Sequence, residues 1–457
     1  MDALTDLFLA YDIRGKVGTQ LTPALVGKIG RAFADWLPIP GAVVVGRDMR
    51  PDSHQLATAL IDGLRRQGRD VIDIGQVTSD MVYFAIGKLN SSGGAVITAS
   101  HNSGSYNGIK FYRDHVTAVG LDSGLDVIRD AILQKNIRTP AKNKGSLKHR
   151  NITKAWAAHC LAFGPNIKPF RVAIDNGNGM AGAILPYILP KLPIEAEVMY
   201  GQPDGTFPNH EANPQKLENL QDLIHQVIDK KLDFGIAFDG DGDRAVFVDD
   251  LGRPVLGTDL LSIIAKLYLD KYPGGMIIHE VRTSRASQEL ISEWGGTPIR
   301  TKAGRVNIGS LMRQKGAVFG GETTGHMFFK ENYDADSGLI TAIAAMQALS
   351  NSGKKLSELV NKYRRYVMIP ETNLIVADPA AVFSKLRQVF ADGNQDELDG
   401  LTVNYPDKWF NLRSSNTEPV MRLSAEAKTQ DDLDKLVAKI IGLVKETAVT
   451  NERKALQ

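Results

Sequence analysis

The chain has 457 residues, of which 43% are hydrophobic and 23% charged, a balance that excludes a largely disordered protein. Single hydrophobic cores stop growing near about 250 to 300 residues, so a chain of this length predicts three or four domains. The 54 basic and 52 acidic residues nearly cancel, which gives no sign of nucleic-acid or membrane-surface binding. The single cysteine, Cys160, excludes an internal disulfide and a thiolate metal cluster, and it fits a reducing compartment.

The opening segment, MDALTDLFLAYDIRG, carries acidic groups and no apolar run long enough for a signal peptide or for a membrane span of about 20 residues. We therefore expect an unexported, cytoplasmic protein. Its expected partners are small molecules, with no nucleic acid and no membrane, and its expected state is a monomer or a weak homodimer.

The first part of the chain alternates between helical and strand patterns. Residues 22–36 open on a Thr-Pro pair and continue with apolar residues at helical spacing, which predicts a helix with Thr22 as its N-cap. An apolar run at 42–45, an amphipathic stretch at 53–66 and a second apolar run at 71–74 follow. This order is typical of a βαβ unit.

The same alternation returns twice before the pattern changes. One unit has a strand at 171–174, a helix at 217–228 and a strand at 234–238, and the next runs from 260 through 276–278 to 319. Beyond about residue 367 come two helices, the second near 431–444, and separated strands at 373–376, 401–405 and 420–424. This indicates a smaller α+β domain. A basic stretch at 142–150 marks the first domain boundary.

A polar loop, Thr98 to Lys110 (TASHNSGSYNGIK), follows the apolar strand 94–97. Loops at the carboxyl ends of strands are where α/β sheets bind ligands. Ser100 is therefore a candidate nucleophile, and His101 and Lys110 are candidates to take its proton or to neutralise a phosphate. On composition alone, a turn rich in small polar residues explains this segment about equally well.

Three carboxylates, those of Asp239, Asp241 and Asp243, stand close together in FDGDGDR after the predicted strand 234–238. Their mutual repulsion is severe unless a cation lies among them, and oxygen ligands favour a hard ion such as Mg²⁺. An EF-hand calcium loop is the competing interpretation. It is the weaker one, because Arg244 occupies the position that needs glycine and because the segment before the loop is a strand.

Two further loops carry polar side chains suited to a sugar phosphate. GGETTGH, at 320–326, offers the carboxylate of Glu322, the hydroxyl of Thr324 and the imidazole of His326 for sugar hydroxyls. NLRSSNTEP, at 411–419, combines the forked guanidinium of Arg413 with the hydroxyl and amide groups that a phosphate monoester needs, those of Ser414, Ser415, Asn416 and Thr417. Each loop taken alone is also compatible with an ordinary turn.

These four motifs, in this order, resemble the α-D-phosphohexomutase superfamily and, within it, the bacterial phosphomannomutase/phosphoglucomutase group, over essentially the whole chain. The resemblance implies three similar α/β domains with mixed sheets plus a C-terminal α+β domain with an antiparallel sheet, around a central cleft. The expected domains are 1–147 with the phosphoserine loop, 148–250 with the metal-binding loop, 251–367 with the sugar-binding loop and 368–457 with the phosphate-binding loop.

The resemblance also implies roles for individual residues. Ser100 resembles the phosphorylated serine, and together with Asp239, Asp241 and Asp243 it is expected to bind Mg²⁺. Arg244 resembles the family's active-site arginine, and His101 and Lys110 resemble the neighbours of its serine. The implied substrate-binding residues are Tyr11, Arg14, Arg282, Arg305, Glu322, Thr324, His326, Arg413, Ser415, Asn416 and Thr417.

The sequence departs from the family pattern at a few positions. Ser103 stands where relatives usually have proline, and Arg282 stands where they often have a phosphate-contacting lysine. Arg305 replaces a histidine that relatives often place near the substrate, which puts that contact in doubt. Thr324 lies in GETTGH where relatives have GEMSGH, and it still supplies a hydroxyl.

The implied reaction interconverts hexose 1-phosphate and hexose 6-phosphate of mannose, glucose or both. Phospho-Ser100 gives its phosphoryl group to the sugar, and the resulting hexose 1,6-bisphosphate, an intermediate and activator, turns and returns its other phosphate. Lys110, His101 and His326 are all candidates for the general base. The alternatives are a phosphoglucosamine mutase, which would have SGT where this chain has SNT, a sugar phosphatase that forms a phosphoserine, and a non-catalytic sugar-phosphate-binding relative.

Overall fold

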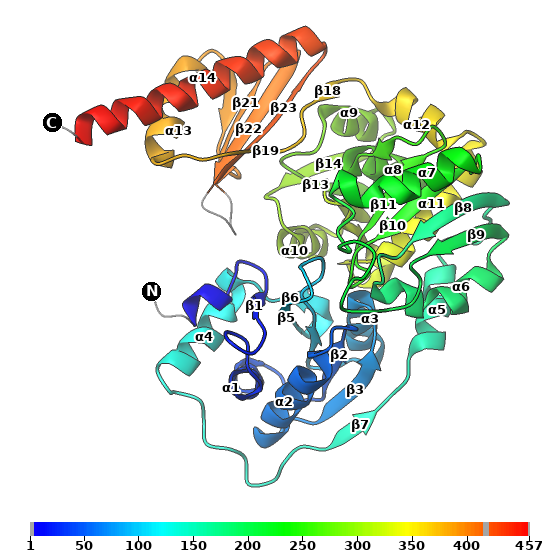
Figure 1. Ribbon diagram of the computed structural model, residues 1–457, viewed down its shortest axis with the longest axis vertical. Coiled ribbons are helices and arrows are strands. Elements are labelled where there is room, and N and C mark those ends of the chain that lie inside the picture. Colours follow the sequence, from blue (N-terminus) through cyan, green and yellow to red (C-terminus); the bar gives the residue numbers. More distant parts are fainter. Residues whose placement is uncertain (1–3, 415–419, 456–457) are drawn as a thin grey trace.

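The computed structural model describes residues 4–414 and 420–455, which fold into four sheets with their helices (Figure 1). In Figure 1 the N-terminal domain lies at the bottom in blue, and two further α/β domains lie above it in green and yellow. The orange and red C-terminal domain lies at the top, beside α9 (Arg285–Glu293).

The first sheet combines parallel and antiparallel strands. Its elements are β1 (Ile13–Lys16), α1 (Pro23–Trp36), β2 (Val43–Arg47), α2 (Ser53–Arg66), β3 (Val71–Gln76), α3 (Ser79–Leu89), β4 (Gly93–Ile97), β5 (Tyr106–Arg113), β6 (Thr117–Ala118), α4 (Leu125–Leu133) and β7 (Leu147–His149). The strand order is β1-β5-β4-β2-β3-β7, with β6 paired to β5. The strands β4, β2, β3 and β7 are parallel, whereas β5 and β1 run antiparallel to their neighbours.

The second sheet has the order β12-β11-β10-β8-β9. Its elements are α5 (Thr153–Leu161), β8 (Phe170–Asp175), α6 (Leu185–Ile188), β9 (Ile194–Met199), α7 (Gln221–Asp229), β10 (Phe234–Phe238), β11 (Ala245–Asp249) and β12 (Pro254–Val255). The strands β10, β8 and β9 are parallel, and β11 folds back antiparallel to β10.

The third sheet has the order β14-β13-β15-β16-β17. Its elements are α8 (Gly257–Lys271), β13 (Met276–Glu280), α9, β14 (Thr297–Thr301), α10 (Arg305–Lys315), β15 (Phe319–Gly321), β16 (Met327–Phe329), β17 (Ala335–Asp336), α11 (Gly338–Ser352) and α12 (Leu356–Tyr363). The strands β14, β13 and β15 are parallel, and β16 folds back antiparallel to β15.

The same arrangement of two consecutive strands therefore recurs in all three α/β sheets. A buried strand of the parallel part, β4, β10 or β15, is followed by an antiparallel neighbour, β5, β11 or β16. The turn between the two strands holds the serine loop in the first sheet, the three aspartates in the second and the Glu322 loop in the third. The fold thus presents three chemically different loops at the same position of three similar sheets.

The C-terminal sheet differs because all of its pairings are antiparallel. Its elements are β18 (Val367–Met368), β19 (Thr372–Leu374), α13 (Pro379–Val389), β20 (Asn394–Asp396), β21 (Leu401–Asn404), β22 (Lys408–Ser414), β23 (Met421–Ala427) and α14 (Gln430–Ala455). The helices α13 and α14 pack on this sheet around Leu386, Phe410 and Ile440. The expected fold class, three α/β domains with mixed sheets followed by an α+β domain with an antiparallel sheet, is confirmed.

Packing joins the four domains unequally. The largest hydrophobic core runs through all three α/β domains, with Phe84 from the first, Phe247 from the second and Phe319 from the third among its buried members. The C-terminal domain has a separate core of its own. Its contacts with the third domain include polar ones, such as the hydroxyl of Ser284 donating to Glu426 at 2.6 Å.

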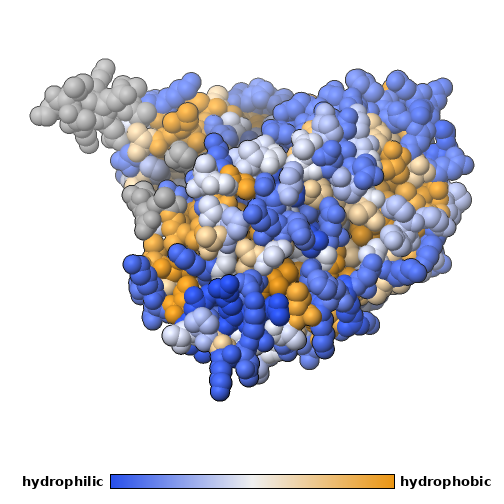
Figure 2. All heavy atoms as spheres, turned by 60° about the horizontal axis from the view of Figure 1, so that its bottom comes forward, coloured by the Kyte–Doolittle hydropathy of each residue, from blue (hydrophilic) through white to orange (hydrophobic). Residues whose placement is uncertain are grey.

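Most predicted elements in the first half lie where the sequence placed them. The helix predicted at 22–36 is α1, whose N-cap Thr22 accepts a hydrogen bond from the backbone NH of Leu25. The helix predicted at 217–228 is divided into a 3-10 turn, Leu217–Leu220, and α7. Within residues 4–414 and 420–455, no helix combines the length and the apolar character that a membrane span requires. Hydrophilic residues cover most of the face in Figure 2, and hydrophobic ones form scattered groups between them.

Candidate active site

Ser100 lies in the turn between β4 and β5, where the parallel part of the first sheet ends. It is buried, and its backbone NH donates to Oγ1 of Thr98 at 2.9 Å. Its φ is +50°, in the left-handed region that residues other than glycine rarely adopt. Strained backbone of this kind is concentrated at functional sites, where the surrounding structure holds it in place.

The guanidinium of Arg50 holds this loop, a role that the sequence analysis missed. It donates at 2.5 to 2.9 Å to the backbone carbonyls of Ser100, Asn102, Ser103 and Tyr106. Its Nε pairs with the buried carboxylate of Asp48 at 3.1 Å. The sequence did contain a signal, because Arg50 belongs to the polar segment DMRPD that directly follows β2, the same strand-end position as the other loops.

The three aspartates after β10 form a buried group that can hold a metal ion. Asp239, Asp241 and Asp243 are inaccessible to solvent, and one carboxylate oxygen of each lies within 4.8 Å of the others. The Oδ1 atoms of Asp241 and Asp243 have no hydrogen-bond partner among the described residues. Buried carboxylate oxygens without donors fit a hard cation, which would satisfy them.

The aspartate loop is fixed against the serine loop by two domains. The backbone NH of Ser79 donates to the carbonyl of Asp241, and that of Met180 donates to the carbonyl of Gly240, both at 2.9 Å. A Cβ atom on Gly240 would lie 2.4 Å from the backbone oxygen of Ser100. Only glycine therefore permits this approach of the two loops.

Lys110 supplies positive charge to two of the aspartates. Its Nζ lies 2.6 Å from Oδ2 of Asp241 and 2.6 Å from Oδ2 of Asp243. Burial alone would raise the pKa of Asp241, but the ammonium outweighs it, and the pKa of this carboxyl is well below its usual range. Burial would likewise lower the pKa of Lys110, and the two carboxylates reverse the effect and raise it, so Lys110 is protonated.

Arg244 and Ser100 converge on the third aspartate. Oδ2 of Asp239 accepts from Oγ of Ser100 at 2.9 Å and from Nε of Arg244 at 2.9 Å. Burial, with repulsion from the other two aspartates, raises the pKa of Asp239 despite the arginine. Nδ1 of His101 lies 3.2 Å from Oγ of Ser100 and 2.5 Å from Nη2 of Arg244. Burial, reinforced by Arg244, lowers the pKa of His101, so the ring is neutral and its Nδ1 accepts.

The loop after β15 presents Glu322, Thr324 and His326. The Glu322 carboxylate accepts from the hydroxyl of Thr324 and from the backbone NH of Gly304, both at 2.7 Å. Nδ1 of His326 lies 2.6 Å from Oδ2 of Asp336 and 3.7 Å from Oδ1 of Asp243. His326 thus places the third domain's loop against the aspartates of the second.

Residues of the opening segment and of the KAGR loop join the first domain to the third. The hydroxyl of Tyr11 donates to the carbonyl of Ala303 at 3.0 Å. Arg305 is buried and donates to the hydroxyl of Tyr112 and, at 3.3 Å, to the carbonyl of Tyr11. The guanidinium of Arg14 pairs with Asp12 at 2.6 Å and with the Asn102 side chain, in the serine loop, at 2.5 Å.

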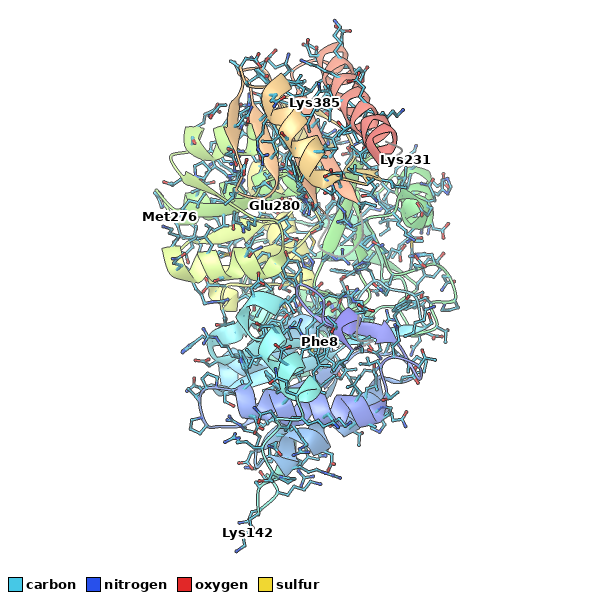
Figure 3. All side chains as sticks on the ribbon, turned by 90° about the vertical axis from the view of Figure 1, so that its left-hand side faces the viewer. Phe8, Lys142, Lys231, Met276, Glu280 and Lys385 are labelled. Atoms are coloured by element: carbon cyan, nitrogen blue, oxygen red, sulfur yellow. The ribbon has the colours of Figure 1, made fainter. Side chains whose placement is uncertain are left out.

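Arg282 and Arg413 meet at the junction of the third and C-terminal domains. Arg282 follows β13, which runs from the exposed Met276 to the buried Glu280, both labelled in Figure 3. The side chain of Glu371, which was not predicted, accepts from Arg282 at 3.0 Å and from Arg413 at 2.7 Å. Three of the residues predicted to bind phosphate, Ser415, Asn416 and Thr417, lie outside the described residues.

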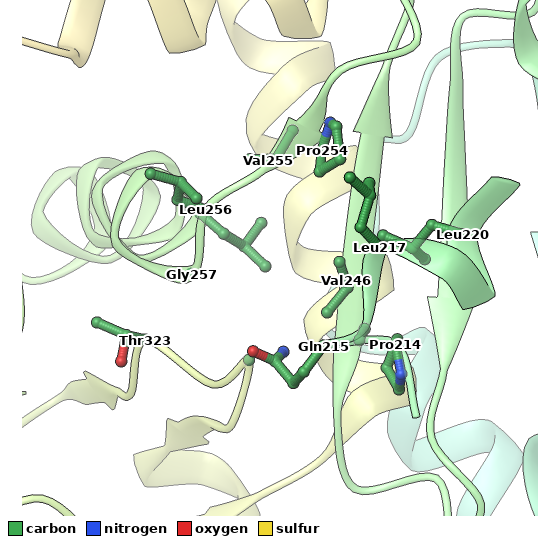
Figure 4. A pocket seen from close by; sticks show the side chains of 13 residues that line it. Pro214, Gln215, Leu217, Leu220, Val246, Pro254, Val255, Leu256, Gly257 and Thr323 are labelled. Atoms are coloured by element: carbon green, nitrogen blue, oxygen red, sulfur yellow. The ribbon is translucent and has the colours of Figure 1, made fainter. Parts of the chain in front are cut away.

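A pocket of about 130 Å³ lies beside the loop at 320–326 (Figure 4). Apolar side chains such as Leu217, Val246 and Leu256 line it, and Thr323 stands at its edge. None of the predicted site residues that the structure describes lines this pocket. Its apolar lining does not suit a sugar phosphate, so it is separate from the site described above.

Comparisons with known proteins agree with this geometry. Models of the phosphoglucomutase/phosphomannomutase family match residues 5–135, 157–252 and 257–366 as alpha/beta/alpha domains I, II and III, and residues 371–443 as the C-terminal domain. Phosphohexose mutases of Xanthomonas campestris are 38% identical over 427 residues, which cover 92% of this chain and 95% of the relative. Phosphomannomutase/phosphoglucomutase of Pseudomonas aeruginosa is 35% identical, with 94% and 93% covered.

A solved structure leads to the same conclusion. A phosphoglucomutase/phosphomannomutase family protein from Burkholderia thailandensis is 32% identical, covers 97% of both chains and has a TM-score of 0.89. Fold, site and relatives together define a phosphohexomutase, an isomerase that acts on small phosphorylated sugars. The chain belongs to the phosphoglucomutase/phosphomannomutase family.

Proposed function

We propose that this enzyme interconverts the 1-phosphates and 6-phosphates of mannose and glucose through phospho-Ser100 and a hexose 1,6-bisphosphate. The observation that carries the proposal is the convergence of Ser100, Asp239 and Arg244, which come from two domains, within hydrogen-bond distance. Phosphate transfer depends on positioned charge, and this constellation places charge around the serine oxygen. Relatives named phosphomannomutase/phosphoglucomutase support both sugars as substrates.

Mg²⁺ is the proposed metal, held by Asp239, Asp241, Asp243 and an oxygen of phospho-Ser100. The unsatisfied Oδ1 atoms of two of these aspartates support this choice. When bound, the ion would neutralise charge on the transferring phosphoryl group. Arg244 would position that group, and Lys110 would add positive charge on its other side.

Among the three candidates for the general base, His326 fits best. Lys110 is protonated and occupied by two carboxylates, and Nδ1 of His101 accepts from Arg244. Nδ1 of His326 instead lies 2.6 Å from Oδ2 of Asp336, a carboxylate outside the aspartate triad. Burial would lower the pKa of His326, but Asp243 and Asp336 outweigh it and raise this pKa, which favours a base. Glu322 and Thr324 would then bind sugar hydroxyls, while Tyr11, Arg14 and Arg305 would line the opposite side.

The remaining phosphate of the sugar is proposed to bind between Arg282 and Arg413 with the Ser415, Asn416 and Thr417 loop. The order of the sheets supports the division into domains 1–147, 148–250, 251–367 and 368–457, but three strands extend past these boundaries. The strand β7 continues the first sheet to His149, β12 continues the second to Val255, and Val367 of β18 already belongs to the C-terminal sheet. The near balance of 54 basic and 52 acidic residues supports the absence of a nucleic-acid partner, and a monomer or weak homodimer is the proposed state. The buried, unpaired Cys160 supports a cytoplasmic location.

The test is to supply each of the four hexose phosphates and follow isomer, bisphosphate and free phosphate. Isomerisation of both mannose and glucose phosphates, activated by hexose 1,6-bisphosphate, is the expected result. A dedicated contact to one epimer can give about 10⁴-fold rejection, so a preference above about a thousandfold would contradict dual use. Preference for glucosamine phosphate would identify a phosphoglucosamine mutase, and release of phosphate without isomer would identify a phosphatase.

A further inference from the structure

The carboxylate of Glu371 bridges two arginines of different domains. Oε2 accepts from Nη1 of Arg282 at 3.0 Å, and Oε1 accepts from Nη2 of Arg413 at 2.7 Å. A carboxylate held between two guanidinium groups in this way uses the donors that would otherwise bind phosphate oxygens. The two ion pairs therefore place an internal anion where the proposed function needs a substrate anion.

The bridge crosses a boundary between separately packed domains. Arg282 follows β13 of the third sheet, and Arg413 lies in β22 of the fourth. Glu371 lies between β18 and β19, which both pair with β23, so it moves with the C-terminal sheet. Since the C-terminal core is separate from the core of the α/β domains, this contact is one of the polar links that hold them together.

Arg282 does not depend on Glu371 alone for its position. Nε of Arg282 also pairs with the buried Glu280, at 2.9 Å from one oxygen and 3.0 Å from the other. Arg413 is buried within its own sheet. The side chain of Glu371 is 27% exposed, against 8% for Arg282 and 5% for Arg413, so Glu371 is the member of this group most accessible to solvent.

We propose that Glu371 is an internal competitor for the phosphate site, and that the non-transferred phosphate of the substrate enters by displacing its carboxylate from Arg282 and Arg413. The inference rests on the proposed phosphate-binding role of the two arginines. A phosphate monoester carries about −1.5 to −2 charge and three acceptor oxygens, so it can replace both ion pairs. The links from Ser284 to Glu426 would keep the two domains joined during the exchange.

The experiment measures inorganic phosphate as a competitive inhibitor of the wild type and of Glu371→Gln. The amide keeps the shape of the side chain and removes its charge, so phosphate should bind about fivefold tighter or more to the variant. KM for 1-phosphates and 6-phosphates should fall together. A residue that merely positions the arginines predicts weaker binding, so unchanged or weaker inhibition by phosphate would overturn the inference.

Glu293→Gln is the matched control. Glu293 pairs with Arg365 at 2.6 Å, in the exposed segment before β18, and it joins α9 to that segment as Glu371 joins the two sheets. Glu293→Gln removes one negative charge, as Glu371→Gln does, but inhibition of this control by phosphate should match that of the wild type. An equal gain in affinity in the control would overturn the inference, because the effect would then be one of net charge.

Arg413→Ala separates this inference from the proposed function. If phosphate inhibits Arg413→Ala as strongly as the wild type, the proposed role of the arginines fails, and the role of Glu371 fails with it. If Arg413→Ala binds phosphate more weakly while Glu371→Gln is unchanged, the arginines bind phosphate and only the competition by Glu371 is wrong.

Discussion

Oγ of Ser100 lies 2.9 Å from Oδ2 of Asp239, although the two residues come from different domains and are 139 positions apart in the chain. The contact exists because the α/β domains share a hydrophobic core, and their packing brings the turns after β4 and β10 together. The candidate nucleophile and the candidate metal site are therefore brought together by domain packing and not by any local motif. Substitutions at either turn should affect both.

Replacing Ser100 tests two things, its role as the phosphorylated residue and the strain in its backbone. Ser100→Ala and Ser100→Gly should both abolish mutase activity and remove one phosphate from the intact mass. Because φ is +50° here, the glycine variant should be more stable than the alanine variant by about 1 kcal/mol, measured by denaturant unfolding. Near-normal turnover in either variant would exclude Ser100 as the phosphoryl carrier.

Arg50 offers a test of loop positioning. Arg50→Lys keeps the charge, but one ammonium cannot donate to all the carbonyls that the guanidinium holds. A misplacement of the serine by about 1 Å should lower kcat about a hundredfold, with KM largely kept. Arg47→Lys is the control, since Arg47 ends the strand that precedes Arg50 and pairs with Asp73 at 3.5 Å. Equal kcat values for the two variants would contradict the positioning role.

The sequence singled out the glycine-rich loops of Ser100 and Asp239, but not Arg50, although its loop also follows a strand. Ser100 and Asp239 were found because an apolar run and then a polar, glycine-rich loop are visible within a dozen residues. Glu371 was missed because its partner Arg282 lies 89 positions away, and its own surroundings, MIPETN, look like an ordinary connection. The central strand β22 was also missed, since polar residues such as Asn411, whose amide nitrogen donates to Asp399 and Thr402, interrupt its apolar pattern.

Metal binding should release a proton. In the metal-free site the pKa of Asp239 is raised, chiefly by burial, so this carboxyl keeps a proton above the usual carboxyl range. A cation must displace that proton, and Mg²⁺ affinity should therefore fall as the pH is lowered through the raised pKa. Titration calorimetry in buffers of different ionisation enthalpy measures the released proton.

The raised pKa of Asp239 also determines how the stability of the fold changes with pH. In the unfolded chain, Asp239 loses its proton at the usual carboxyl pKa, whereas in the folded chain it keeps the proton to a higher pH. Protonation of Asp239 therefore stabilises the fold without metal at lower pH. This stabilisation is lost as the pH rises through the folded-state pKa. Thermal unfolding with and without Mg²⁺ should therefore diverge as the pH rises. Activity that persists after exhaustive chelation, or Mg²⁺ binding without proton release, would contradict the metal assignment.

Arg413 should serve both directions of the reaction. One Ser100 must meet both ends of the sugar in turn, so the distal phosphate needs an anchor that does not depend on which end is reacting. The C-terminal domain carries Arg413 and has a core of its own, which allows it to close over the substrate and to reopen while the intermediate turns.

Arg413→Ala should therefore weaken 1-phosphate and 6-phosphate substrates alike. It should also release more free hexose 1,6-bisphosphate per turnover, because closure retains the intermediate and keeps water from phospho-Ser100. The measurement is the rate in both directions, with free bisphosphate quantified during turnover. Arg387→Ala is the control, because Arg387 lies in the same domain and forms an exposed ion pair with Glu397. If only one direction is impaired, or no more bisphosphate escapes than from the wild type, Arg413 is not the common anchor, and another group must hold the phosphate while the sugar turns.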